Sequence, residues 1–254
     1  MTLPRAPSFR LDGRRALVVG ASSGIGMAAA VALAEQGAEV WLAARREAEL
    51  HSLMAELKAL GFSAHVLPLD VSAVEAAEET ISDLLPFDVL VNSAGGSRHG
   101  PATETRLEDF DFAVSLNFRA AYFLTRAVAK RLIAEGKPGS LINISSQMAH
   151  VGGIDRAVYS ATKHALEGMT KSMAIEWGPH GIRVNTIAPT FIRTAMTAAT
   201  FANPERAAWI AAKIKLGRVG ELEDIMGPVA FLASDAASLI TGTSLIVDGG
   251  WTAD

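Results

Sequence analysis

Short apolar runs alternate along the chain with longer segments of helical periodicity. The apolar runs predict strands at residues 15–19, 39–43, 64–69, 89–92, 140–144, 183–187 and 244–247. The segments between them predict helices at residues 24–36, 47–60, 73–84, 107–135, 157–178 and 221–232. Several strand candidates are apolar on consecutive positions, which is typical of parallel strands covered on both faces. The pattern predicts an α/β fold, a Rossmann-type doubly wound parallel sheet flanked by helices on both faces.

No internal repeat, low-complexity tract or compositional break divides this alternation, so a single domain over residues 1–254 is expected. The stretch 190–219 is less regular, is rich in Ala, Thr and Phe, and follows a predicted strand end. It fits a substrate lid and, equally, an ordinary pair of surface helices.

Composition narrows the classes of function. The 254 residues carry 23 Lys and Arg against 27 Asp and Glu, a net charge of −4, and no cysteine. A disulfide framework, a thiolate metal site and a catalytic thiol are therefore excluded, and no zinc-type spacing is present, so no metal is predicted. Lys and Arg form no run longer than two, which argues against a nucleic-acid partner. Without a signal peptide or a membrane-length apolar run, the sequence predicts a cytoplasmic protein with a small-molecule substrate and no membrane partner.

A glycine-rich loop follows the first predicted strand and opens into a helix. It reads Gly20-Ala21-Ser22-Ser23-Gly24-Ile25-Gly26. Glycines let a backbone turn tightly and approach a pyrophosphate, and a helix N-terminus offers free N–H groups and a positive dipole end. Alone, the loop suits a tight strand-to-helix connection equally well, but its place after the first strand favours a dinucleotide site. The candidate contacts are Gly20, Ser22, Ser23, Gly24, Ile25 and Gly26.

The end of the second strand predicts which nicotinamide cofactor binds. In a dinucleotide-binding unit, a residue about 20 positions past the glycines reads the adenosine ribose. Arg45 and Arg46 hold that place. A guanidinium fork favours a 2′-phosphate, whereas an acidic residue would accept from a free 2′-hydroxyl. The sequence predicts NADP(H) over NAD(H), with NAD(H) as the alternative if both arginines only solvate a loop.

Two further strand ends are expected in the same crevice. Asp70 ends the third strand, where its carboxylate and the Val71 amide can meet an adenine edge; alternatively, Asp70 caps the following helix. Asn92 ends the fourth strand, and the small residues Ala94 and Gly95 after it leave room for a cofactor against the backbone.

Tyr159 and Lys163 lie four positions apart in a segment of helical periodicity, so their side chains share one face. A tyrosine exchanges protons at neutral pH only if its pKa, normally near 10, falls by roughly three units, about 4 kcal/mol. An ammonium at about 4 Å supplies about that much at an effective dielectric of about 20. Lys163 is therefore expected to lower the pKa of Tyr159. A tyrosine and a lysine four positions apart are common on solvated helix faces. Other residues at the site must therefore decide whether this pair is catalytic.

Two polar residues can complete the site. Ser145 and Ser146 follow an apolar strand, at the edge where open α/β sheets bind ligands. Asn117 interrupts the apolar stripe of a predicted helix. Such an amide needs a partner, and it can hold a water that links Lys163 to solvent or be a satisfied core asparagine.

Taken together, these motifs resemble the classical short-chain dehydrogenase/reductase family over nearly the whole chain, from the glycine loop to Val247-Asp248-Gly249-Gly250. The resemblance implies a catalytic tetrad of Asn117, Ser146, Tyr159 and Lys163, with Ser146 preferred because it lies 159 − 146 = 13 residues before the tyrosine. It also implies cofactor contacts from Tyr159, Lys163, Pro189, Ile192 and Thr194. The chain departs from the family pattern at Val19, Ser93 and Thr190, which bears on local cofactor contacts.

The same resemblance implies interconversion of a secondary alcohol and a ketone, with Tyr159 as acid or base, and a homo-oligomer, a tetramer or dimer. The likeness extends to gluconate-type sugar-acid dehydrogenases and 3-oxoacyl-thioester reductases. A non-catalytic cofactor-binding regulator and an isomerase or dehydratase are the rival classes. The expected pocket residues are Arg98, His99, Gln147, Met148, His150, Phe191, Met196, Phe201 and Trp209.

Overall fold

A computed structural model describes residues 3–253 of the chain. Its sheet has seven parallel strands in the order β3-β2-β1-β4-β5-β6-β7. The strands are β1 (Arg15–Val19), β2 (Glu39–Ala44), β3 (Ala64–Pro68), β4 (Val89–Asn92), β5 (Gly139–Ile144), β6 (Ile182–Pro189) and β7 (Ser244–Val247). The predicted strands are confirmed to within two residues at each end, and so is the doubly wound architecture.

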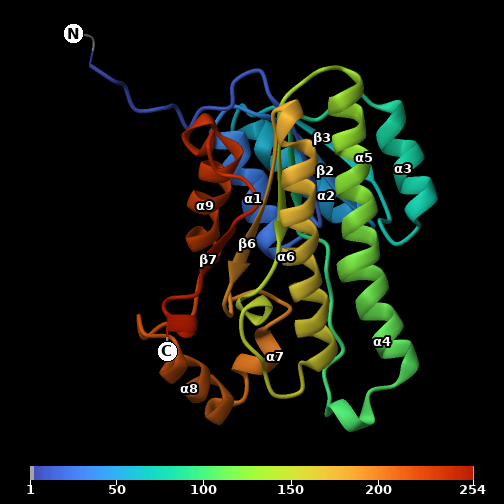
Figure 1. Cartoon of the computed structure of the whole chain (residues 1–254). Helices are drawn as coiled ribbons and strands as arrows, with labels where there is room; N and C mark the ends of the chain where they lie inside the picture. Colours follow the sequence, from blue (N-terminus) through green and yellow to red (C-terminus); the bar gives the residue numbers. More distant parts are fainter. Residues whose placement is uncertain (1–2, 254) are drawn as a thin grey trace.

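Helices cover both faces of this sheet, as Figure 1 shows. One face packs against α1 (Gly24–Glu35), α2 (Glu47–Ala59) and α9 (Glu223–Ala233). The other packs against α3 (Val74–Asp83), α5 (Ala121–Ala134) and α6 (Ala157–Trp177). All six residues of β5 are buried, because this central strand has a covered face on each side. That double coverage is why the strands read as continuous apolar runs in the sequence.

The order of the strands places a crevice at the carboxyl ends of β1 and β4. β1 pairs with β2 on one side and with β4 on the other, so the chain winds outward in opposite directions from this point. The loops that leave β1 and β4 therefore diverge. In open α/β sheets, ligands bind outside the carboxyl ends of strands at such a switch point.

The helix expected over residues 107–135 is three segments in one rod. They are α4 (Leu107–Val114), a π-helical turn η2 (Ser115–Ala120) and α5. A π-turn widens a helix by one residue per turn and is found mostly at functional sites. Asn117 lies in this turn and is 1% exposed, which is how a polar side chain enters the interior from an otherwise apolar helix.

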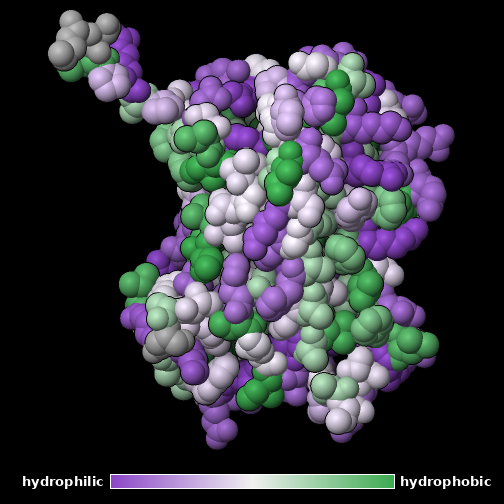
Figure 2. All heavy atoms as spheres, viewed as in Figure 1, coloured by the Kyte–Doolittle hydropathy of each residue, from purple (hydrophilic) through white to green (hydrophobic). Residues whose placement is uncertain are grey.

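The rod also leaves apolar side chains at the surface. Leu107, Phe110 and Tyr122 are each more than a third exposed. In Figure 2, hydrophobic residues gather over the lower part of this face, where α4 and the lower half of α6 lie, and hydrophilic residues dominate the outer helices above. An oligomer interface along these helices stays a prediction.

The segment after β6 contains two helices, α7 (Ala198–Phe201) and α8 (Pro204–Lys213). Asn203 caps α8 by accepting a 3.0 Å hydrogen bond from the Arg206 amide. Ile210 and Ile214 hold α8 against Trp251 in a small core of its own. The structure thus contains the helix pair that the sequence allowed, and movement as a lid stays a prediction.

The remaining short helices are 3₁₀ turns: η1 (Ala102–Glu104), η3 (Gln147–Ala149), η4 (Gly178–His180), η5 (Asp235–Ala237) and η6 (Trp251–Ala253). Across residues 3–253 no helix combines the length and apolarity needed to cross a bilayer. Within the same residues, no group of three or more His, Asp or Glu side chains is placed to hold a metal ion.

Candidate active site

The glycine loop between β1 and α1 is folded too tightly for side chains at two of its positions. Gly20 has φ +81°, and a Cβ there would lie 2.9 Å from the Ser93 carbonyl carbon. A Cβ on Gly26 would collide with the Gly20 carbonyl oxygen. The Ser23 side chain makes no capping bond to the described backbone, so the first amides of α1 remain available to a ligand. This is the geometry in which a loop and a helix N-terminus hold a phosphate.

Arg46 closes over this loop. Its Nη2 donates to Ser22 Oγ at 2.8 Å and to Ser23 Oγ at 2.7 Å, and its Nη1 donates to Glu49 Oε1 at 3.3 Å. Arg46 and its neighbour Arg45 are both exposed at the end of β2. Two cations and two hydroxyls therefore meet where the adenosine ribose of a dinucleotide is expected.

The third strand end is organised differently from the expectation of a helix cap. The Asp70 carboxylate accepts from the Ser72 amide at 2.9 Å and from the Ser72 hydroxyl at 2.7 Å, while Ala73 holds the N-cap position of α3 without a side-chain capping bond. These bonds, helped by the charge of Arg45, hold the pKa of Asp70 below its usual range against the opposing effect of burial. Asp70 shapes the turn that contains the buried Val71.

At the end of the fourth strand, the backbone of the following turn lies beside the candidate site. Asn92 donates to Asn143 Oδ1 at 3.0 Å and accepts from the Ala94 amide at 3.2 Å, so its amide joins β4 to β5 and fixes the turn after it. A Cβ on Gly95 would lie 3.2 Å from Asn117 Oδ1 and 3.8 Å from Lys163 Nζ. Gly95 thus brings the backbone of this turn beside the lysine.

Ser146 and Tyr159 meet at the carboxyl end of β5. Ser146 follows the strand, and its Oγ accepts from the Met148 amide at 3.1 Å. Tyr159 lies in the first turn of α6 and is half-buried. Burial raises the pKa of Tyr159, while its hydrogen bond with Ser146 and the charge of Arg156 oppose that rise. The phenol is therefore the neutral, proton-carrying form at neutral pH.

Lys163 lies near Tyr159 and is held by the end of β5. Its ammonium is 4% exposed, lies 5.7 Å from the centre of the tyrosine ring and donates to the Ile144 carbonyl at 2.8 Å. Burial lowers the pKa of Lys163 to about 8, and the charge of Glu167 works against that fall. Arg156 is the charge that lowers the pKa of Tyr159 in this structure, so a lowering of that pKa by Lys163 stays a prediction.

Asn117 is the satisfied core asparagine that the sequence allowed. Its Nδ2 donates to the Gly96 carbonyl at 2.8 Å and to Thr162 Oγ1 at 3.2 Å, and its Oδ1 accepts from the Gly96 amide at 2.8 Å. Both N–H donors of the amide are therefore occupied, which leaves the side chain no donor for a water molecule. Asn117 instead clamps the turn after β4 to α6.

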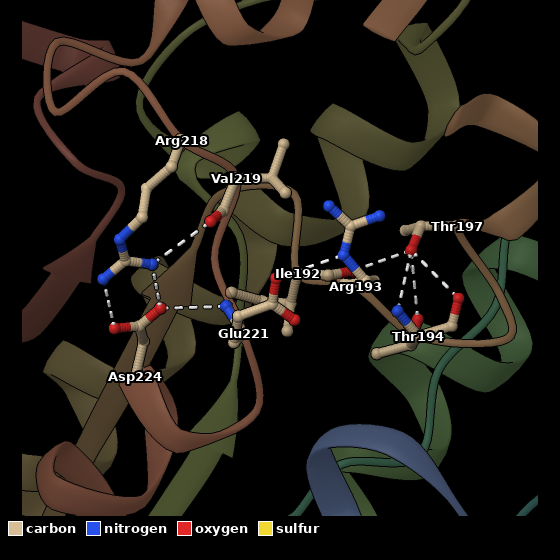
Figure 3. Close-up of polar contacts among 8 residues, drawn as sticks. All are labelled: Ile192, Arg193, Thr194, Thr197, Arg218, Val219, Glu221 and Asp224. Atoms are coloured by element: carbon tan, nitrogen blue, oxygen red, sulfur yellow. Dashed lines mark hydrogen bonds and ion pairs between the residues drawn. The ribbon is translucent and has the colours of Figure 1, made fainter. Parts of the chain in front are cut away.

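The segment after β6 is pinned at its base (Figure 3). Thr197 Oγ1 donates to the Ile192 carbonyl at 2.7 Å and accepts from the Thr194 amide at 3.0 Å. The Thr194 side chain faces the glycine loop, since a Cβ on Gly24 would lie 3.5 Å from its Cγ2. Ile192 is buried, and Pro189 ends β6. Thr194 thus lies beside the glycine loop, whereas Ile192 packs against Gly220, and cofactor contacts from Pro189 and Ile192 stay predictions.

A network of ion pairs supports this base, also drawn in Figure 3. Arg193 pairs with Glu221 at 3.1 Å, and Arg218 binds both carboxylate oxygens of Asp224 at 2.6 and 2.8 Å. Asp224 also accepts from the Glu221 amide at 2.8 Å. The Arg218 contact is the main reason that the pKa of Asp224 falls to about 2. The start of α9 therefore fixes the segment next to the cofactor crevice.

Three buried polar atoms at this edge of the sheet have no hydrogen-bond partner among the described residues. They are Ser145 Oγ, Gln147 Nε2 and Thr190 Oγ1, which follow the ends of β5 and β6. Buried polar groups are nearly always hydrogen-bonded in native proteins. All three follow strand ends where ligands of open α/β sheets bind, and this placement fits a dinucleotide and a hydroxylated substrate.

The pocket beside Tyr159 differs in part from the expected one. His99 packs edge-on against the tyrosine, with ring centres 5.8 Å apart. Arg98 instead turns to α4, where it pairs with Asp109 at 2.9 Å. His150 bonds Ser244 Oγ of β7 at 2.9 Å. Met196 is 76% exposed.

The aromatic and buried members of the expected set lie elsewhere. Trp209 packs edge-on against Trp251, Phe191 packs at a tilt against the same ring, and Phe191 also packs edge-on against Phe201. Gln147 and Met148 are buried in η3, directly after Ser146.

Sequence reasoning missed two arginines. The charges of Arg156 and Arg206 both act on His99, and the two guanidinium groups repel each other. Burial, helped by the charges of both arginines and opposed by that of Asp155, lowers the pKa of His99 to about 4, so that imidazole is neutral. Within residues 3–253 neither arginine forms an ion pair with a carboxylate. Their spacing in the sequence, 50 residues apart on different elements, gave no signal of this meeting.

Comparisons with known proteins agree with this arrangement. Residues 20–252 match the family model described as enoyl-(acyl carrier protein) reductase. The chain is 40% identical over 245 residues to D-erythrulose reductase of Gallus gallus, covering 96% of this chain and 98% of that protein.

Two solved structures share the fold over nearly their whole length. One, a proposed 2-deoxy-D-gluconate 3-dehydrogenase of Agrobacterium tumefaciens with bound NADP, has a TM-score of 0.93 and 42% identity, covering 97% of this chain and 99% of that one. The other, a gluconate 5-dehydrogenase of Burkholderia cenocepacia in complex with NADP and tartrate, has a TM-score of 0.91 and 34% identity, covering 97% and 98%.

Proposed function

Because the chain belongs to the classical short-chain dehydrogenase/reductase family, we propose that it is an NADP(H)-preferring oxidoreductase that interconverts a ketone and a secondary alcohol on a hydroxylated acid. The observation that carries the proposal is the meeting of Ser146, Tyr159 and Lys163 at the carboxyl end of β5, beside a loop shaped for a dinucleotide. Asn117 completes the proposed tetrad by holding the turn at Gly96.

The preference for NADP(H) is supported by the end of β2. Arg46 already donates to two hydroxyls there, and a 2′-phosphate oxygen can replace them as the acceptor of charge-assisted bonds. Glu49, an acid of the following helix, is held by Arg46 itself at 3.3 Å. Two of the similar structures contain NADP.

The proposed chemistry follows from the protonation of the tetrad. When bound, reduced nicotinamide supplies the hydride for the carbonyl carbon. The Tyr159 phenol donates its proton to the carbonyl oxygen, and the Ser146 hydroxyl hydrogen-bonds the same oxygen as negative charge develops on it. Burial raises the pKa of Tyr159, so the phenol can act as the proton donor in ketone reduction. The buried ammonium of Lys163 stabilises the phenolate that forms.

An acidic substrate is supported by the two arginines beside the tyrosine. Arg156 and Arg206 bring two positive charges to a pocket whose histidine is neutral, and Asp155 is the acid whose charge opposes theirs. A second anion, from the substrate, would balance the remaining positive charge. A carboxylate is the anion of sugar acids, and the similar gluconate 5-dehydrogenase structure holds tartrate, which has two carboxylates. D-erythrulose reductase, by its name, acts on a neutral ketose, so the two substrate types can be compared directly.

Turnover with a panel of ketones tests the proposed function. We expect the purified chain to oxidise one NADPH for each keto-sugar acid that it reduces. The rate with NADPH should exceed the rate with NADH. Formation of product without net loss of NADPH would indicate an isomerase or dehydratase instead. Cofactor binding without turnover of any ketone would indicate a regulatory protein.

Removal of either pocket arginine tests the substrate class. Arg156→Ala and Arg206→Ala are each expected to lower kcat/KM for a keto-sugar acid about tenfold to a hundredfold, the value of one or two charge-assisted hydrogen bonds. The kcat/KM for a neutral ketose should change less than about threefold, because only the carboxylate contact is lost. Arg98→Ala is the matched control, since that arginine is paired with Asp109. An equal loss on both substrates would contradict the assignment.

A further inference from the structure

His99, in the turn after β4, touches the proposed general acid and has no role in the proposed chemistry. Its ring packs edge-on against Tyr159, with ring centres 5.8 Å apart and an angle of 86° between the ring planes. The neighbouring Arg98 points away and pairs with Asp109 on α4 at 2.9 Å. His99 is therefore the side chain that this part of the turn brings to the tyrosine.

The turn that carries His99 is held in place by the protein itself. The Gly96 amide donates to Asn117 Oδ1 at 2.8 Å, and the Gly96 carbonyl accepts from Asn117 Nδ2 at 2.8 Å. A Cβ on Gly96 would lie 3.0 Å from Phe112 Cζ, so the Phe112 ring packs directly against this backbone. A side chain on a turn fixed in this way loses little freedom when a ligand binds, which favours specific recognition.

Ser97 holds the imidazole from within the same turn. Its Oγ lies 2.6 Å from His99 Nδ1. Among residues 3–253, no hydrogen bond reaches the other ring nitrogen, Nε2. His99 is exposed, so a ligand that lies beside Tyr159 can reach Nε2.

The imidazole is neutral, and this decides what Nε2 can bind. Partial burial is the main cause that lowers the pKa of His99 to about 4. In a neutral imidazole, one nitrogen donates and the other accepts. If the Ser97 hydroxyl donates to Nδ1, then Nε2 carries the hydrogen and donates. If Nδ1 donates to Ser97 instead, Nε2 accepts.

A hydroxyl group is the ligand that both forms of this pair can bind. A hydroxyl donates and accepts hydrogen bonds, so it satisfies Nε2 in either tautomer. A carboxylate only accepts, and its hydrogen bonds to a guanidinium are stronger than those to a neutral donor. An apolar substituent would displace water from Nε2 and leave that nitrogen without a partner.

We propose that His99 is a specificity-determining residue that binds a hydroxyl group on the carbon next to the reacting carbonyl, with Ser97 as its positioning residue. This role rests on the proposed function, in which Tyr159 donates its proton to the carbonyl oxygen. The Tyr159 hydroxyl bonds Ser146, whereas His99 contacts the tyrosine ring. Nε2 therefore lies beside the reacting oxygen and not on it, where a substituent of the adjacent carbon is placed.

The role of His99 narrows the substrate to α-hydroxy ketones. Ketoses and keto-sugar acids carry a hydroxyl on the carbon next to the carbonyl. A 3-oxoacyl chain has methylene groups on both sides of its carbonyl, so it offers Nε2 no partner. A site that hydrogen-bonds a substrate hydroxyl rejects the analogue that lacks it. His99 thus separates two substrate types to which the sequence is equally similar.

A pair of matched keto acids tests this role. The two acids have equal chain length, and only one carries a hydroxyl on the carbon next to the carbonyl. His99→Phe keeps an aromatic ring against Tyr159 and removes both nitrogens. It should lower kcat/KM for the hydroxylated acid about tenfold to a hundredfold, the effect of one hydrogen bond left unmade. The kcat/KM for the deoxy acid should change less than about threefold, which also shows that the variant is folded.

The decisive quantity is the change in the ratio of the two kcat/KM values. Comparing this ratio between variant and wild type cancels the intrinsic difference in reactivity between the two ketones. His99→Gln, whose amide also donates and accepts, should restore part of the ratio. Ser97→Ala removes the partner of Nδ1 and should lower the ratio about threefold to tenfold. His180→Phe is the matched control, since it changes an exposed histidine in η4, just before β6, and should leave the ratio unchanged.

The outcomes separate the role of His99 from the function beneath it. Equal losses on both acids in His99→Phe would mean that His99 only packs against Tyr159, and they overturn the proposal. An unchanged ratio in His99→Phe overturns it as well, since the hydroxyl is then bound elsewhere. Both results leave the dehydrogenase intact. A wild-type chain that reduces neither keto acid with NADPH refutes the function itself.

Discussion

Tyr159→Phe is expected to lower kcat for ketone reduction by about 10³-fold, within the range attributed to a general acid. The substitution removes the one hydroxyl that can protonate the substrate oxygen from the position beside Ser146. The ring and its edge-on contact with His99, at 5.8 Å between centres, are kept, so the pocket retains its shape. The measurement is single-turnover oxidation of NADPH, which reports the chemical step directly.

The control uses the other tyrosine of the chain. Tyr122 lies on α5 and is 38% exposed, so Tyr122→Phe removes the same hydroxyl away from the crevice and should leave kcat unchanged. NADPH binding, followed by fluorescence titration, should stay within about twofold in both variants. A Tyr159→Phe variant with a kcat near that of wild type would contradict the role of Tyr159 as the general acid.

Arg46→Ala is expected to weaken NADPH binding about tenfold to a hundredfold and to leave NADH binding nearly unchanged. A hydrogen bond to a charged group contributes about 1.5–3 kcal/mol. The alanine that replaces Arg46 cannot donate such a bond to the 2′-phosphate. Arg45→Ala/Arg46→Ala should abolish the preference, because both exposed cations at the end of β2 are then gone. Dissociation constants for the two cofactors, measured at fixed ionic strength, give the specificity ratio.

Arg126→Ala is the matched control for this change. Arg126 is likewise exposed and paired with one acid, Glu78, but it lies on α5. Its removal should alter both dissociation constants by less than about twofold. Equal weakening of NADPH and NADH in Arg46→Ala would show that the arginine only supports the loop through Ser22 and Ser23.

Much of the fold was determined by local patterns in the sequence. Each strand reads as a short apolar run because its two faces are covered, and this property belongs to consecutive residues. The glycine loop is equally local, since Gly20 and Gly26 are the two ends of one seven-residue loop. Their lack of side chains permits its tight turn. Spacing along a single helix also fixed that Tyr159 and Lys163 share a face.

Contacts between elements were decided only by the tertiary structure. A four-residue spacing cannot show that Lys163 turns to the Ile144 carbonyl or that burial raises the pKa of Tyr159, because both depend on which strand lies beneath α6. Periodicity likewise concealed the π-turn that carries Asn117 inward. The charge of Arg206, on α8, acts on His99 after β4, and Glu167 meets Thr186 because α6 packs on β6. Patterns of neighbouring residues specify local geometry. The burial of a group and the charges around it depend on side chains far apart in the sequence, which only packing brings together.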